Sequence, residues 1–366
     1  MQKYAYNQIS LMQYIFLLYK TQLGIGVFTL PRIVAEDVGH DGWISILLGY
    51  MLSNIVSILV IKLMEKHPDQ TLYEILPCFF GKWVGNLINI ILILFTLIGA
   101  SIVIFGIISI VQVWSMPKSH QFVLMLLFLV PVYLVTKQGV RNMSNYAQFV
   151  FLFTMWQPLL IMSTIYDAEI LNFLPIFSEG IPHVLEGVRG TLFSFMGFEM
   201  SFFLYPFLKD KKHAIRGVII ANTLCLNILL SVTLICFSKF SQEEILDFIW
   251  PTLNLLKTIQ TPVLERLEIP FLSFYLPVVL ISVVTYLYIS LLGITTLTKK
   301  SNHIPYLWIV LLAWTILSIF YTPSINTLGI VSDWWTEASI YIVFYFSVFL
   351  WGYSLIYHRW QKRGLG

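Results

Sequence analysis

Long apolar stretches recur along the whole chain between short polar breaks. A helix needs about 20 apolar residues to cross the hydrocarbon core of a bilayer, and the sequence supplies that length repeatedly. Of the 366 residues, 58% are hydrophobic and only 11% are charged, whereas a soluble domain carries about 25% charged residues. The chain therefore lacks a water-facing surface, and we expect a single integral membrane domain over residues 1–366.

About ten segments are long and apolar enough to be membrane-spanning helices. Their approximate bounds are Ile9–Ala35, Trp43–Met64, Trp83–Val113, Phe122–Thr136, Tyr146–Tyr166, Val184–Phe207, Ala214–Phe237, Phe271–Leu297, Ile304–Tyr321 and Trp334–Tyr357. Lys and Arg gather in alternate connections, and acidic residues gather in the others. Because cytoplasmic loops retain positive charge, this alternation predicts that both the N- and C-termini are cytoplasmic.

Two connections carry amphipathic sequence. Pro68–Gly81 predicts a short helix on the inner side, before the third span. Ser238–Pro270 mixes acidic and apolar residues on the outer side. This outer segment either caps a solute vestibule or lies on the lipid surface.

Two predicted spans contain glycines near mid-membrane depth. The first span has Gly24 and Gly26, and the sixth has Gly197. One Gly costs only about 1 kcal/mol against Ala in a helix, but spans 1 and 6 are corresponding positions in a five-plus-five inverted repeat. We therefore predict an all-α protein with broken helices 1 and 6. Repeat 1 covers about 9–166, and repeat 2 covers about 184–321, with the last helix at 334–357.

Broken membrane helices expose backbone groups that only a cavity or a ligand can satisfy. Half-helix N-termini favour a carboxylate and C-terminal carbonyls favour an ammonium group, so a small zwitterion matches both. We expect the amides of Gly24, Ile25 and Gly26 to bind the carboxylate. Carbonyls near Gln22 and Phe195 would bind the amino group. Alternatively, the glycines only allow close packing of helices.

Polar side chains in other spans are candidates for the lining of the same pocket. They are Thr96, Ser101, Ser194, Ser282, Thr285 and Tyr286, and Gly197 accompanies them at the sixth-span break. Each hydroxyl could instead bond the backbone of its own helix.

Lys20 and Glu199 are the charged residues deep in the predicted spans. Such a charge costs at least about 2.5 kcal/mol at a helix centre unless it is paired or hydrated, so both should face inward. Each lies on the inner side of a predicted break. We hypothesise an ion pair that gates the exit or replaces a coupling cation; a purely structural pair is the alternative.

The sequence argues against an enzyme, a cofactor, a metal site and a nucleic-acid partner. The histidines lack metal-ligand spacing, and neither a GxSxG elbow nor a Walker loop is present. The net charge is +3, without a dense basic stripe. The partners that we expect are a small-molecule solute and the lipid bilayer.

Two motifs extend this interpretation. Gln22–Pro31 is followed by Gly42-Trp43, and Thr71–Pro77 is followed by Gly81-Lys82. Together they resemble the B subunits of bacterial spore germinant receptors, which belong to the amino acid, polyamine and organocation transporter superfamily. The resemblance implies a LeuT-like fold that binds a germinant, such as an amino acid, between spans 1, 3, 6 and 8. It also implies a receptor A subunit and a lipoprotein C subunit as partners in the spore inner membrane.

Three functions remain open at this point. The first is a receptor subunit in which the filled pocket shifts a conformational equilibrium that its partners detect. The second is a proton- or sodium-coupled amino acid permease with alternating access around the same site. The third is a channel or scaffold without a solute site.

Overall fold

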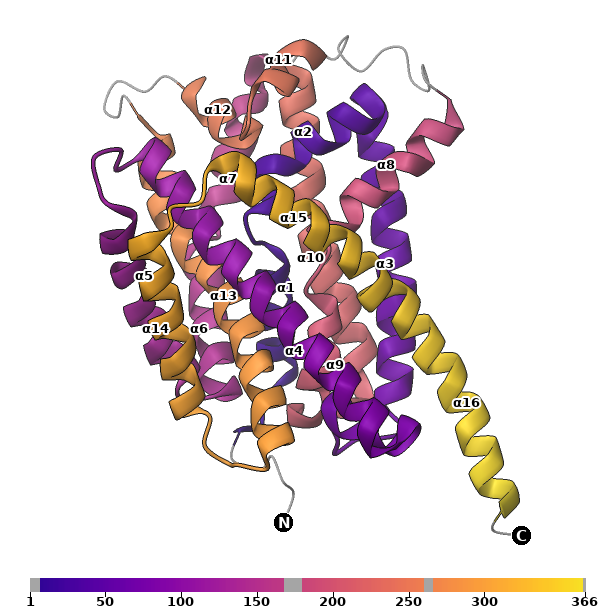
Figure 1. Cartoon of the computed structure of the whole chain (residues 1–366). Coiled ribbons are helices and arrows are strands. Elements are labelled where there is room, and N and C mark those ends of the chain that lie inside the picture. The colour runs from indigo at the N-terminus through magenta and orange to yellow at the C-terminus, as the bar shows by residue number, and fades with distance from the viewer. Residues whose placement is uncertain (1–6, 168–179, 260–265, 365–366) are drawn as a thin grey trace.

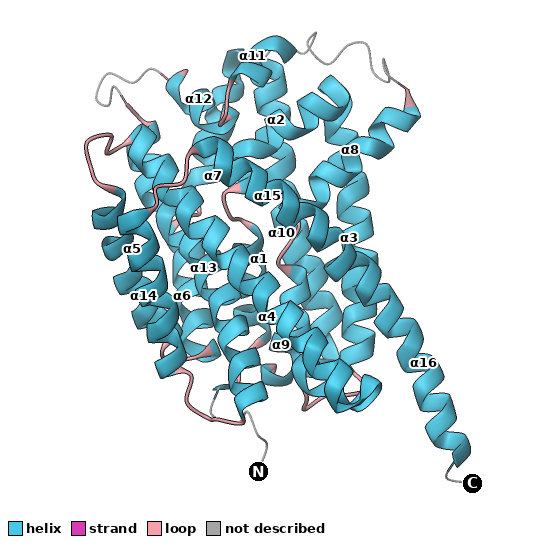
Figure 2. Cartoon of the chain, viewed as in Figure 1, coloured by secondary structure: helices cyan, strands magenta, loops and turns pink. Residues whose placement is uncertain are grey.

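The computed structural model describes residues 7–167, 180–259 and 266–364. Over these ranges the regular secondary structure is helical, joined by loops, apart from one parallel bridge between Ile9 and Leu208 (Figure 2). Six of the described helical stretches are long and apolar enough to cross a membrane, and two further apolar helices are shorter. The all-helical membrane architecture is confirmed, while the number of about ten crossings stays a prediction.

The predicted spans form single helices, bent helices or pairs of half-helices. In chain order the helices are α1 (Leu11–Gln22), α2 (Gly26–Val38), α3 (Gly42–Met64), α4 (Leu72–Trp114), α5 (Gln121–Thr136), α6 (Val140–Phe153), α7 (Trp156–Met162), α8 (Ile181–Ser194), α9 (Ser201–Leu204), α10 (Ala214–Lys239), α11 (Gln242–Asp247), α12 (Pro251–Lys257), α13 (Glu268–Thr298), α14 (Ile304–Phe320), α15 (Ile325–Ser339) and α16 (Phe346–Gly364). A π-helical segment, Ile340–Tyr345, joins α15 to α16.

The two halves of the first span lie inside the bundle. α1 packs against α6, α10 and α13, and α2 packs against α8, α10 and α12. The start of α1 and the end of α16 lie on the same side of the molecule, which we call the termini side (Figure 1). α11 and α12 lie on the opposite side, which we call the distal side (Figure 1). The bundle is thus arranged around the break between α1 and α2.

The amphipathic helix predicted before the third span is present at the start of α4. Thr71 and Glu74 form a capping box there. Ile75 and Leu76 are fully buried. Gly81, with φ 77°, then makes the sharp turn into the long helix, because this backbone conformation is accessible to glycine at little cost.

The predicted distal segment forms α11 and α12, and both pack against α2. Ile245 and Leu253 are fully buried, and the hydroxyl of Thr252 donates a hydrogen bond to the carbonyl of Val27 (2.8 Å). The described part of this connection therefore covers the distal half of the first span. This arrangement agrees with the first of the two alternatives, a cap, and not with a position on the lipid surface.

Candidate ligand-binding site

The first span is interrupted where its glycines predict a break. α1 ends at Gln22, and α2 begins at Gly26. The amides of Ile25, Gly26 and Val27 have no hydrogen-bond partner among the described residues, as is usual for the first turn of a helix. They form a zone of partial positive charge that favours an anion such as a carboxylate.

The backbone on the α1 side of this break is already hydrogen-bonded. The amide of Gly24 donates to the carbonyl of Gln22 (2.9 Å). From α13, Tyr275 donates to the carbonyl of Gly24 (3.1 Å) and Ser282 donates to the carbonyl of Thr21 (2.8 Å). The Gly24 amide is therefore already used in this conformation, and of the predicted carboxylate-binding amides those of Ile25 and Gly26 are left. Each carbonyl oxygen has a second lone pair, so binding of an amino group by carbonyls near Gln22 and Phe195 stays a prediction. The sequence alone could not show which hydroxyls of α13 would donate hydrogen bonds to these backbone carbonyls.

The sixth span is also interrupted. α8 ends at Ser194, and a short helical turn begins at Phe198. Between them Gly197 has φ 129°, which side chains rarely tolerate. A Cβ at Gly197 would lie 2.8 Å from Cγ and 3.0 Å from N of Gln22. The two breaks therefore touch each other.

Glu199 occupies the helix start in the second break. One carboxylate oxygen accepts the amide of Gly197 (2.6 Å), and the other accepts the hydroxyl of Tyr286 on α13 (2.7 Å). The second break thus has acceptors of its own in the Glu199 carboxyl group, whereas the amides that start α2 have no partner among the described residues. The start of α2 is therefore the more favourable of the two breaks for an added anion.

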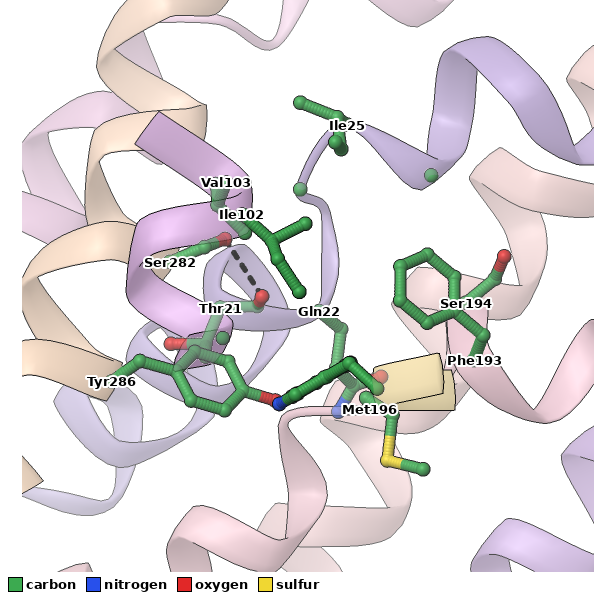
Figure 3. A pocket seen from close by; sticks show the side chains of 14 residues that line it. Thr21, Gln22, Ile25, Ile102, Val103, Phe193, Ser194, Met196, Ser282 and Tyr286 are labelled. Carbon is green, nitrogen blue, oxygen red and sulfur yellow. Dashed lines mark hydrogen bonds between the residues drawn. The ribbon is translucent and has the colours of Figure 1, made fainter. Parts of the chain in front are cut away.

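A cavity lies between the two breaks (Figure 3). Of the residues predicted to bind the ligand or line its pocket, seven line this cavity: Gln22, Gly24, Ile25, Gly26, Ser194, Ser282 and Tyr286. The atoms Gln22 Oε1 and Ser194 Oγ are buried and have no hydrogen-bond partner among the described residues. Because an unsatisfied buried polar atom costs about 1–3 kcal/mol, both oxygens point to a polar guest.

Thr96 and Glu199 line a second cavity. The Thr96 hydroxyl donates a hydrogen bond to the carbonyl of Leu92 in its own helix (3.0 Å). This is the alternative that we gave for hydroxyls within a span. Tyr286 lines the first cavity and donates to Glu199 in the second. The Tyr286–Glu199 hydrogen bond therefore lies between the two cavities.

The other predicted residues do not line the first cavity. Ser101 accepts a hydrogen bond from the Trp314 indole (2.9 Å). Phe195 is fully buried, with its ring 6.2 Å from that of Tyr50. The hydroxyl of Thr285 accepts a hydrogen bond from that of Thr21 (3.1 Å), and Thr21 lines the cavity.

Sequence reasoning missed the apolar wall of the cavity. Ile102, Val103, Phe193, Met196 and Trp335 contribute to it. The Trp335 ring meets that of Tyr286 edge-on at 5.8 Å. Gly99 makes room for this indole, because a Cβ there would lie 2.8 Å from it. Gly99 in an apolar span was an available signal for close packing; nothing in the sequence marked Trp335.

Lys20 and Glu199 do not form the predicted ion pair. Both side chains are only 4% exposed. Lys20 Nζ instead donates to Thr154 Oγ1 (3.0 Å) and lies 4.9 Å from the ring centre of Tyr19. The reason is rotation about the helix axis, since Lys20 faces α6 while Glu199 faces α13. Equal depth in the membrane does not determine which neighbour a side chain meets.

No cluster of three or more His, Cys, Asp or Glu within the described ranges could hold a metal ion. The polar groups around the first cavity are hydroxyls, backbone amides and the Gln22 side-chain amide.

A family model described as spore germination protein matches residues 8–327. The chain belongs to the spore germination protein family. It is 28% identical to spore germination protein YndE of Bacillus subtilis (strain 168), over 98% of each chain. It is 25% identical to spore germination protein GerQB of Bacillus cereus, over 94% of this chain and 95% of that protein. The resemblance seen in the two motifs is thus confirmed.

Solved transporters share the fold of this spore germination protein. MhsT in complex with L-phenylalanine matches with a TM-score of 0.64 at 13% identity, over 90% of this chain and 88% of that chain. A Na⁺-coupled sialic acid symporter matches with a TM-score of 0.62 at 14% identity, over 94% and 80%. The LeuT-like fold with broken helices 1 and 6 is confirmed. The family and fold are those of non-enzymatic receptors and transporters.

Proposed function

We propose that this chain is the germinant-sensing subunit of a spore germination receptor and binds a small amino acid between its two breaks. The observation that carries the proposal is the open start of α2. Its free amides face a cavity that also contains the unpaired oxygens of Gln22 and Ser194. Family membership supports the link to germination.

The ligand that fits these groups is an α-amino acid with an apolar side chain. Its carboxylate lies at the amides of Ile25 and Gly26, and its ammonium group lies near Gln22 Oε1. Its side chain packs against the apolar wall formed by residues such as Ile102 and Trp335. L-phenylalanine bound to MhsT, a protein of the same fold, supports this ligand class.

Ligand binding to the purified full-length protein in lipid nanodiscs tests the proposal. The probe is a panel of the common L-amino acids, and the measurement is the shift in unfolding temperature. We expect at least one apolar amino acid to raise it, because a ligand that binds the folded state alone stabilises that state. A panel without any shift would count against the amino-acid site.

Gly26→Ala is expected to weaken amino-acid binding about tenfold without loss of protein. Its Cβ would lie 3.3 Å from Ser194 Oγ and 3.6 Å from the Phe193 ring. The methyl group is therefore accommodated, but it narrows the cavity beside the carboxylate site, and about 1.4 kcal/mol of lost contact is tenfold in Kd. Titration of the best amino acid from the panel measures the change.

Gly352→Ala is the matched control, because nothing lies within 4 Å of a Cβ at that position. It should bind like the unmodified protein. If the Gly26→Ala protein binds the amino acid with the same affinity as the unmodified protein, the start of α2 is not part of the site.

In this proposal the Tyr286–Glu199 hydrogen bond closes the passage from the first cavity to the second. Ligand binding shifts the equilibrium of this closure, and the partner subunits detect the change. We assign the gate to Glu199 and Tyr286, and leave to Lys20 a role in fixing α1 against α6. The A subunit, the lipoprotein C subunit, the spore inner membrane and the cytoplasmic termini belong to the same proposal.

Arg189 on α8 forms an ion pair with Glu337 on α15 (2.6 Å). Both side chains are at least half exposed, so the pair is worth at most about 1 kcal/mol. Glu337→Gln is expected to change the association rate of the amino acid about two- to fivefold, as measured by stopped-flow mixing. The exchanged pair Arg189→Glu/Glu337→Arg should restore the rate. Failure of this exchange would mean that the charges do not hold the two helices together.

An amino acid permease is the second candidate, and the fold shared with two solved transporters favours it. Uptake of radiolabelled amino acid into proteoliposomes separates the two functions. Accumulation driven by a proton or sodium gradient would support the permease. Binding without accumulation would support the receptor.

A further inference from the structure

Asn222 on α10 is fully buried and joins the first break to α3. Its Oδ1 accepts a hydrogen bond from Gln22 Nε2 (2.9 Å). Its Nδ2 donates to Asn54 Oδ1 (3.1 Å) and to Ser57 Oγ (3.1 Å) on α3. Asn222 does not line the cavity, so it touches a ligand only through Gln22.

The groups on α3 fix which way the Asn222 amide points. The single hydroxyl proton of Ser57 is donated to the carbonyl of Ser53 (2.6 Å). The Nδ2 of Asn54 is donated to the carbonyl of Tyr50 (3.1 Å). Both residues therefore present only acceptors to Asn222. Asn222 must direct its NH₂ group to α3 and its oxygen to Gln22.

The orientation of Gln22 follows from that of Asn222. Its NH₂ group is used by Asn222, so its Oε1 is the free end. Figure 3 shows the Gln22 side chain at the cavity beside Met196, and Oε1 has no hydrogen-bond partner among the described residues. The cavity thus receives an acceptor at this point and no donor.

We infer that Asn222 is a positioning residue that makes the site selective for ligands with a free ammonium group. The inference rests on the proposed function. A ligand that brings an N–H donor to Gln22 Oε1 satisfies a buried oxygen. A ligand that lacks the nitrogen leaves that oxygen unpaired, which is the situation that rejects an analogue most strongly. A ligand whose nitrogen is acylated keeps only one N–H and loses the positive charge. Without Asn222 the Gln22 amide can rotate and present either end.

The test compares free and modified amino acids on full-length protein in nanodiscs. The probes are L-alanine, L-valine, L-leucine and L-phenylalanine, each beside its N-acetyl derivative and its deaminated carboxylic acid. We expect unmodified protein to prefer the free amino acid over the deaminated acid at least about tenfold, the effect of one unmatched buried polar atom. The N-acetyl derivative keeps one uncharged N–H and therefore tests the contribution of the charge. Asn222→Leu and Asn222→Ala, which remove the amide at similar and at smaller volume, should each reduce the preference to about twofold.

Two further variants separate positioning from a structural role. Asn222→Asp keeps an acceptor facing Gln22 and should retain the preference. The double variant Gln22→Leu/Asn222→Leu should lose no more preference than Gln22→Leu alone, since Asn222 acts through Gln22. Asn227→Leu is the matched control, because Asn227 lies on the same helix, is exposed and donates to the carbonyl of Thr223 in its own helix.

The outcomes distinguish the two proposals. If the unmodified protein binds none of these probes, the proposed function fails and this inference fails with it. If the unmodified protein binds them and folded Asn222→Leu or Asn222→Ala protein keeps the full preference, this inference alone is overturned. Additive losses in the double variant would overturn it as well.

Discussion

Gly197→Ala is expected to abolish measurable amino-acid binding and to lower the unfolding temperature of the protein by several degrees. Gly197 has φ 129°, and holding alanine in such a conformation costs about 1–3 kcal/mol. Its Cβ would also lie 2.8 Å from Cγ and 3.0 Å from the backbone N of Gln22. Relief of this clash separates the two breaks, so the cavity loses its shape. Binding and thermal unfolding of purified protein measure both effects.

Gly329→Ala is the control for this substitution. Gly329 lies in α15, and nothing lies within 4 Å of a Cβ there, so the helix should gain about 1 kcal/mol or remain unchanged. If Gly197→Ala protein binds an amino acid with unaltered affinity, the contact between the two breaks is not part of the site.

Glu199→Ala is expected to reduce amino-acid affinity about 30-fold or more and to destabilise the folded protein. It leaves the Gly197 amide and the Tyr286 hydroxyl without the acceptors that they have now. Each unsatisfied buried group costs about 1–3 kcal/mol, and little water is available at this depth to replace the carboxylate. It also opens the wall between the two cavities. Titration and thermal unfolding are the measurements.

Glu199→Gln should be milder, with a loss of about tenfold, because the amide keeps the volume and one acceptor oxygen. Glu243→Gln is the control, since Glu243 is exposed in the first turn of α11. The hydrogen bonds predict the largest loss of affinity for Glu199→Ala, a smaller loss for Glu199→Gln and the smallest for the control. If Glu199→Ala binds as tightly as Glu243→Gln, the carboxylate does not organise the second break.

The positions of the breaks were predictable because their cause is local. Gly24, Gly26 and Gly197 lack a Cβ, and mid-span glycines in corresponding spans are visible without any tertiary information. The side chains around the breaks were less predictable. Ser282 and Tyr286, named as candidates, do reach the cavity, whereas Ser101 and Thr285 bond neighbouring side chains instead. The direction in which a side chain points depends on how its whole helix is rotated within the bundle. An apolar span has no clear polar face from which this rotation could be predicted.

The Lys20–Glu199 hypothesis failed for the same reason. Both residues were correctly expected to be buried, because a charge deep in the membrane is costly unless it faces the protein interior, where it can be paired or hydrated. Their partners, Thr154 for Lys20 and Tyr286 for Glu199, come from helices far away in the sequence. A pairing hypothesis based on depth leaves the angle around the helix axis undetermined.

The sequence by itself determined that this protein is a helical membrane protein of the spore germination family with two interrupted spans. Apolar length, charge alternation and glycine position are properties of short segments and act through the bilayer and the backbone. Only the tertiary structure decided which backbone groups stay open. α13 hydroxyls bind the carbonyls of α1, Glu199 fills the second break, and Asn222 orients Gln22. These hydrogen bonds depend on which donors and acceptors lie close together. Helices that are distant in the sequence come close to one another only in the folded protein.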